Sequence, residues 1–176
     1  MTMKTRESNE SSPARPTGIA AVIELMQSHA DIAGIQEHGC AMLGVLVNHN
    51  KDNKHSIASS GGVQVIVNAM KTYPKNAGLQ ANGMDTLARL AFRDEDKQKA
   101  IVKEGAVAAI LAAMELHTQD DDVQTNGCGV LLILAPNLGD VEKGRGVSAI
   151  QNALRQHPSA DRMQEFGHAA MVSLQS

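Results

Sequence analysis

Four copies of a nine-residue template recur along the chain, and they restrict its fold more than any other feature. The copies read IQEHGCAML (35–43), LQANGMDTL (79–87), VQTNGCGVL (123–131) and MQEFGHAAM (163–171). Their glutamines, at positions 36, 80, 124 and 164, are spaced by 44, 44 and 40 residues. Self-similarity at a period of 20–50 residues is typical of repeat proteins, in which each unit packs only on its neighbours.

The dipeptide Asn82-Gly83 in the second copy raises the question of whether each template is a hairpin or a helix, since Asn-Gly is a strong hairpin signal. The other copies place His38-Gly39 and Phe166-Gly167 at this point, and neither His nor Phe readily takes the positive φ that a type I′ turn needs. Apolar residues instead recur at helical spacing, as at Leu79, Leu87 and Leu90. We therefore predict a helix at each copy. A glycine inside a helix costs about 1 kcal/mol relative to alanine, so its recurrence indicates close approach by a neighbouring helix.

Two further elements complete the period. An upstream template with apolar spacing i, i+3, i+4, i+7 predicts a second helix at 18–26, 62–70, 106–114 and 146–154. A shorter charged segment at 52–62 and 96–106 predicts a short helix that ends at a glycine. The corresponding segment PNLGDVEKGRG (136–146) is shorter and contains one proline and three glycines, so we interpret it as an eroded copy of this element. Its part GDVEKGRG (139–146) is interpreted as a degenerate linker.

Composition narrows the class of protein. Hydrophobic residues make up 43% of the chain but aromatic residues only 2%, so aliphatic side chains must form the core. A net charge of -3 gives no general attraction to nucleic acid or anionic lipid. No apolar run approaches the ~20 residues that span a bilayer, and no apolar signal sequence follows Met1. We expect a soluble cytoplasmic protein, with the nucleus as the alternative, in which residues 1–17 are a disordered tail and 18–176 form the repeat domain.

The pattern resembles the armadillo repeat. The residues that carry the resemblance are KAIVKEGAVAAILAAM followed by DVQTNGCGVLLILA, and the glycine-separated first helix favours armadillo over HEAT repeats. The resemblance implies an all-α, right-handed α-solenoid of about three repeats, an alpha-alpha superhelix. Its long third helices would line a concave groove that binds an extended peptide or a partner protein.

The groove positions depart from those of family members that bind nuclear-import cargo, which use Trp and Asn four residues apart on the third helix. The Trp position falls at Ala41, Asp85, Gly129 and Ala169, and the Asn position at Val45, Arg89, Ile133 and Ser173. Because neither signature residue occurs, import-cargo binding is disfavoured. The resemblance implies a partner-binding set of Glu37, Ala41, Val45, Asn82, Asp85, Arg89, Asn126, Ile133 and Ser173. The i,i+4 pair Asp85–Arg89 is either part of this surface or an exposed intrahelical salt bridge.

Other residues that suggest chemistry have structural explanations. His29, Tyr73, His117 and His157 recur after each second helix, but packed helices lie ~8 to 10 Å apart and cannot share a metal ion through equivalent residues. Cys40 and Cys128 are two repeats apart, too far for a disulfide, and are interpreted as apolar packers. The segment QDDD (119–122) lacks calcium-loop spacing, so we interpret it, together with Asp31 and Asp161, as negative charge at helix N-termini.

These observations predict no cofactor, no metal site and no catalytic residues. The predicted function is a non-enzymatic protein-interaction scaffold that binds a peptide or protein in the groove. The alternative is a self-assembling building block or the remnant of a longer solenoid, since neither end shows a polar capping repeat and the uncapped ends would allow a homo-oligomer.

Overall fold

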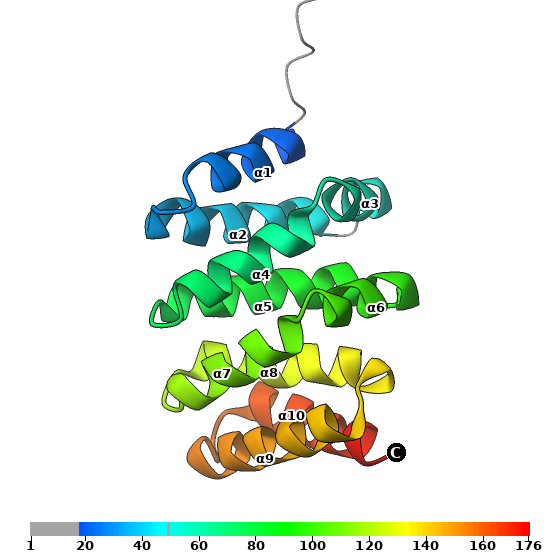
Figure 1. Cartoon of the computed structure of the whole chain (residues 1–176). Coiled ribbons are helices and arrows are strands. Elements are labelled where there is room, and N and C mark those ends of the chain that lie inside the picture. Colours follow the sequence, from blue (N-terminus) through cyan, green and yellow to red (C-terminus); the bar gives the residue numbers. More distant parts are fainter. Residues whose placement is uncertain (1–17, 49) are drawn as a thin grey trace, which may run out of the picture.

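The computed structural model describes residues 18–48 and 50–176, and the tail predicted at 1–17 lies outside this range. Every regular element in this part of the chain is a helix (Figure 1). In chain order they are α1 (Gly18–Ser28), α2 (Ala33–Val47), α3 (Lys51–Ser59), α4 (Gly62–Thr72), α5 (Ala77–Ala91), α6 (Glu95–Lys103), α7 (Ala106–Leu116), α8 (Asp121–Leu134), the 3-10 turn η1 (Ala135–Asn137), α9 (Asp140–Gln156) and α10 (Asp161–Gln175).

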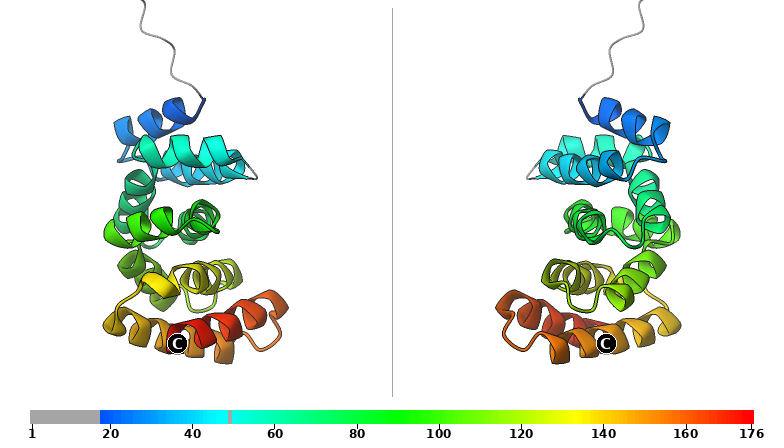
Figure 2. Two further views of the ribbon diagram at one scale, coloured as in Figure 1. Left: turned by 90° about the vertical axis from the view of Figure 1, so that its right-hand side faces the viewer. Right: turned by 90° about the vertical axis from the view of Figure 1, so that its left-hand side faces the viewer.

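The helices form a two-layered, right-handed solenoid. The template helices α2, α5, α8 and α10 pack one on the next, and α1, α4, α7 and α9 form the second layer (Figure 2). The short helices α3 and α6 lie along one edge of the stack (Figure 1). The stack is bowed, so that its two ends reach further than its middle on the side of α2 and α10 (Figure 2). The predicted all-α solenoid is confirmed, and α5 covers the segment where a hairpin was the alternative.

The recurring glycine is required by close packing within each repeat. A Cβ atom added at Gly39, Gly83 or Gly127 would lie 2.5, 3.0 or 2.6 Å from the side chain of Met26, Met70 or Met114, respectively. At Gly167 the same atom would lie 2.8 Å from Leu154. The close approach predicted from the sequence is therefore confirmed, and the neighbour is a large side chain from the preceding second helix.

The recurring glutamine has a role that the sequence pattern did not reveal. The Nε2 atom of Gln80, which is buried, donates to the carbonyl oxygens of Met70 at 2.9 Å and Tyr73 at 3.0 Å. Gln36, Gln124 and Gln164 make the same pair of bonds in their own repeats, at 2.8–3.0 Å. Helix C-termini leave carbonyl groups without intrahelical partners. Each glutamine satisfies two of them and joins the second helix of its repeat to the third.

The interpretation of 139–146 as a degenerate linker is wrong, because Asp140 to Gly146 are helical and continuous with the second helix in α9. In the two preceding repeats, Gly61 and Gly105 adopt left-handed φ values of 78° and 76° and break the chain between the first and second helices. The equivalent position in the last repeat is Arg145. A residue with a Cβ atom disfavours that conformation, so the helix continues through it.

The residues that follow each second helix connect neighbouring repeats. The Tyr73 hydroxyl donates to the carbonyl of Ala30 at 2.9 Å, and Nε2 of His117 lies 2.7 Å from the carbonyl of Pro74. Nε2 of His157 lies 2.7 Å from the carbonyl of Thr118, and its Nδ1 contacts Asp121. A carbonyl only accepts hydrogen bonds, so each ring nitrogen that faces one carries the proton. These bonds hold consecutive second helices in a common register.

The helix N-termini only partly match the sequence interpretation. Asp120 is the N-cap of α8, and its side chain accepts from the Val123 backbone N–H at 2.9 Å. Asp161 opens α10 without capping it, and Asp31 precedes Ile32, which occupies the uncapped N-terminal position of α2. The role assigned to QDDD is therefore confirmed, whereas side-chain capping does not extend to the other two aspartates.

Candidate functional site

The predicted binding residues lie on the third-helix layer formed by α2, α5, α8 and α10, but several of them already bond to neighbouring helices. The Glu37 carboxylate accepts from Nδ2 of Asn76 at 2.9 Å. Nδ2 of Asn126 donates to the carbonyl of Ala81 at 3.1 Å. These two side chains connect α2 with the N-terminus of α5 and α8 with α5, so their positions are set by the fold.

The predicted pair of Asp85 and Arg89 is present, with Nε of Arg89 2.7 Å from Oδ2 of Asp85. Both side chains are about 40% exposed, so the pair adds no more than about 0.5 kcal/mol to stability. Arg89 also donates to Oδ1 of Asn48 at 3.3 Å, beyond the end of α2. The geometry is that of an intrahelical salt bridge that extends to the neighbouring repeat, and a role in binding stays a prediction.

A hollow of about 250 Å³ lies between α5, α8 and α10, and we name it the concave hollow. Three of the predicted residues line it, Asp85, Asn126 and Ile133. The remaining predicted residues lie elsewhere on the layer: Val45 is 76% exposed on α2, whereas Ala41, Asn82 and Ser173 are partly buried and Glu37 and Arg89 make the bonds described above. The structure thus brings together about a third of the predicted set.

Two aromatic rings line the concave hollow, and sequence reasoning did not place them there. Phe92 follows α5 and is 52% exposed, and Phe166 lies on α10 against the core. Gly129 on α8 also lines the hollow and has no side chain, and a Cβ atom there would lie 3.5 Å from Cδ2 of Phe166. Because the chain has two phenylalanines and no tryptophan, both Phe rings at one site are a notable concentration of its aromatic surface.

Arginine side chains cover both rings. The guanidinium carbon of Arg93 lies 5.1 Å from the centroid of the Phe92 ring, and that of Arg162 lies 5.6 Å from the centroid of Phe166. Both distances are within the range of cation–π attraction. The concave hollow therefore has apolar walls with positive charge at its margin.

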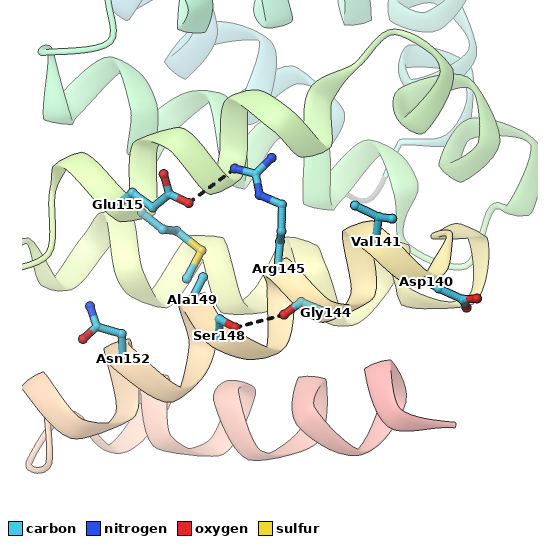
Figure 3. Close-up of a pocket in the computed structure, with 9 residues that line it drawn as sticks. Glu115, Asp140, Val141, Gly144, Arg145, Ser148, Ala149 and Asn152 are labelled. Carbon is cyan, nitrogen blue, oxygen red and sulfur yellow. Dashed lines mark hydrogen bonds and ion pairs between the residues drawn. The ribbon is translucent and has the colours of Figure 1, made fainter.

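A second, larger hollow of about 450 Å³ lies on the opposite layer, between α7 and α9 (Figure 3). Three of its polar side chains are already paired: Arg145 reaches Glu115 at 3.3 Å, and the Ser148 hydroxyl donates to the carbonyl of Gly144 at 3.1 Å (Figure 3). None of the predicted binding residues lines this hollow.

The thiols behave as the sequence interpretation requires. Burial raises the pKa of Cys128 to about 12, and burial together with the nearby Glu37 carboxylate raises the pKa of Cys40 to about 12. Both are free and buried, so neither is an activated nucleophile. Within residues 18–48 and 50–176, no three His, Cys, Asp or Glu side chains come together in a way that could hold a metal ion. In the same part of the chain, no helix combines the length and the apolar character needed to cross a membrane.

Comparisons with known proteins agree with this architecture. The chain is similar to the crystal structure of an engineered protein from the Northeast Structural Genomics Consortium, with a TM-score of 0.68 and 21% identity. The match covers 90% of this chain and 63% of the engineered one, and at this identity the likeness supports the fold alone. Comparison with curated proteins gave no match. The family model described as LRRK2 ARM repeat matches residues 15–105, which is more than half of the 176 residues, and the chain therefore belongs to the armadillo-repeat family.

Proposed function

We propose that this protein is a non-enzymatic interaction scaffold that binds an extended segment of a partner protein across the third-helix layer, with the concave hollow as its anchoring point. Armadillo repeats generally bind proteins or peptides, and this supports the class of partner. The cytoplasmic location expected from the sequence belongs to the same proposal.

The size of the concave hollow supports a peptide side chain as its occupant. Its volume of about 250 Å³ is below the ~300–1,000 Å³ of sites that enclose whole small molecules. A pocket of this size, lined by two aromatic rings, is suited to one apolar side chain of a longer ligand. The observation that carries the proposal is Gly129, whose missing side chain leaves space in the hollow beside Phe166.

Asn126 is placed to hydrogen-bond the extended backbone of a peptide that lies beside the concave hollow. Its amide nitrogen is held by the carbonyl of Ala81, which orients the side chain. An amide oxygen has two acceptor positions, so Oδ1 of Asn126 can accept a backbone N–H from a segment lying along α8.

The test is selection from a phage-displayed library of random 12-residue peptides, followed by fluorescence anisotropy with the selected peptides. Gly129→Leu adds a large side chain to a residue that lines the hollow, and the first added carbon makes only ordinary contact with Phe166, so we expect a folded protein. Binding should weaken at least tenfold, as expected when a central anchor is blocked. Ser148→Leu, which adds the same side chain on the exposed surface of α9, is the matched control and should bind normally. Selected peptides that bind the Gly129→Leu protein as tightly as the wild type would contradict the proposal.

A second candidate function is self-assembly, which is favoured by the exposed apolar face of α1 and α2. Leu25, Ile32 and Met42 are 49%, 44% and 53% exposed and line an apolar hollow of about 430 Å³. The equivalents of Met42 in the next two repeats, Thr86 and Val130, are fully buried against the preceding repeat. Size-exclusion chromatography with light scattering tests this candidate: wild type should associate as its concentration rises, and Met42→Glu should not. A wild-type protein that stays monomeric at every concentration would exclude it.

A further inference from the structure

A second hollow adjoins the concave hollow at Phe92 and is lined mainly by cations. This basic hollow, of about 610 Å³, lies between the starts of α3 and α6 and the end of α5. Its charged lining residues are Lys51, Lys54, Arg93 and Lys97 together with one carboxylate, Asp94. Because Phe92 belongs to both hollows, one bound segment can reach both.

The single carboxylate of the basic hollow is already engaged. Asp94 caps α6 by accepting from the backbone N–H of Lys97 at 3.1 Å, and it also forms a salt bridge with the Lys97 ammonium group. The hydrogen bond from the Lys97 side chain holds the pKa of Asp94 below its ordinary value. In the part of the chain that the structure describes, no salt bridge involves Lys51, Lys54 or Arg93. Three positive charges in the basic hollow therefore have no carboxylate partner there.

Burial disfavours the charged form of Lys54 in this hollow. Burial lowers the pKa of Lys54, and the nearby Lys97 lowers it further, whereas Asp94 acts in the opposite direction. Nζ of Lys54 is 3.5 Å from the carbonyl oxygen of Phe92, so the ammonium group is directed to the end of α5. An ammonium group beside another cation favours an incoming anion.

Two of these cations occupy positions that are unfavourable for the fold. Lys51 is the first residue of α3, where the helix dipole is already positive and acidic residues are preferred. Arg93 has a left-handed φ of 57°, a conformation that favours glycine. Residues that occupy positions or backbone conformations disfavoured for their type tend to be found at functional sites. Both exceptions line the same hollow.

We propose that the basic hollow selects acidic partners: the bound segment places an apolar side chain in the concave hollow and one or more aspartate or glutamate carboxylates in the basic hollow. This inference rests on the proposed function, because it assumes that a peptide lies on the third-helix layer. The charge complementarity of Lys51, Lys54 and Arg93 gives the segment its acidic character. Ionic contacts of this kind weaken with salt, so binding should fall as ionic strength rises.

The peptide selection described above also tests this inference. We expect enriched sequences to contain an apolar residue close to Asp or Glu. Enrichment of basic or uncharged peptides whose binding is still blocked by Gly129→Leu would overturn the inference and leave the proposed function intact. If no enriched peptide depends on Gly129, both proposals fail.

Two substitutions separate recognition from folding. Lys51→Glu places a favoured acidic residue at the start of α3, and Arg93→Gly places a glycine in the left-handed conformation, so neither should lower the unfolding midpoint. Each should weaken binding of the selected acidic peptide about tenfold, within the range for a close charge pair. Lys75→Glu, an exposed substitution in the turn between α4 and α5 that changes the charge by as much as Lys51→Glu, is the control and should bind normally. Acidic peptides that bind the Lys51→Glu and Arg93→Gly proteins as tightly as the control would also overturn the inference.

Discussion

Packing of the third-helix glycine against the second-helix methionine predicts opposite outcomes for the same substitution at two helical glycines. Gly127→Ala places a methyl group 2.6 Å from Sδ and 2.7 Å from Cγ of Met114, about 1 Å closer than the ~3.5–4.0 Å of a normal contact. Gly144→Ala, in the interior of α9, places the same methyl group where no atom lies within 4 Å.

The steric cost can be isolated because helix propensity acts equally at both sites. Replacing glycine by alanine in a helix stabilises by about 1 kcal/mol. At Gly127 this gain is opposed by about 1–3 kcal/mol for overpacking a filled core. We therefore expect Gly144→Ala to raise the free energy of unfolding by about 0.5–1 kcal/mol. Gly127→Ala should leave it unchanged or lower it by up to about 2 kcal/mol.

The assay is urea denaturation followed by circular dichroism at the helical band, with both variants compared with wild type. Met114→Ala, alone and combined with Gly127→Ala, completes a double-mutant cycle. Truncating Met114 removes the obstructing atoms, so in that background Gly127→Ala should stabilise by about as much as Gly144→Ala does. If Gly127→Ala and Gly144→Ala stabilise the wild-type protein equally, the glycine is not required by close packing and the reasoning is refuted.

Three further predictions concern the bonds within and between repeats and the buried thiols. Gln80→Ala removes the bond to the Met70 carbonyl and leaves the Tyr73 carbonyl with only the Asn76 backbone N–H, so it should lower the free energy of unfolding by about 1–3 kcal/mol. Gln64→Ala, at an exposed residue of α4, should change it by less than about 0.5 kcal/mol. Equal effects of the two substitutions in urea denaturation would exclude the role of Gln80 in joining α4 to α5. Tyr73→Phe removes only the hydroxyl that donates to Ala30 and should cost about 0.5–1.5 kcal/mol, and a thermal scan that shows no loss would argue against this bond between repeats. Burial raises the pKa of Cys40 and Cys128 to about 12 from an ordinary value of 9.0, so both thiols should resist iodoacetamide at pH 8 until the protein unfolds. Their contribution to stability should decline as the pH rises above 9.0, because the thiols of the unfolded chain ionise first. Rapid labelling of the native protein would contradict their burial.

The sequence was sufficient to predict the architecture because the same physical need recurs at a fixed period. Helical apolar spacing, repeated glycines and a charged first helix each appear in several copies. A misleading residue in one copy can therefore be recognised by comparison with the equivalent residues of the other copies. The hairpin signal at Asn82-Gly83 failed for this reason: His38 and Phe166 at the equivalent positions excluded it. The wrong interpretation of 139–146 rested on its glycine content, whereas the feature that decided the helix was Arg145, at the position where a left-handed glycine breaks the two preceding repeats.

Only the tertiary structure decided which residues meet. Periodicity gives the face of a helix but not the contacts between repeats, because those depend on how far each layer is rotated and shifted against the next. Asp85, Asn126 and Ile133 were expected on the groove, yet Phe92 and Phe166 join them only because the end of α5 and the start of α10 border the same hollow beside α8. The basic hollow likewise combines Lys51 and Arg93, 42 positions apart in the chain, because the start of α3 and the residues that follow α5 line the same hollow. The repeated sequence pattern therefore determined the scaffold. Residues that differ from this pattern determined the candidate site, because the fold brings them close to one another.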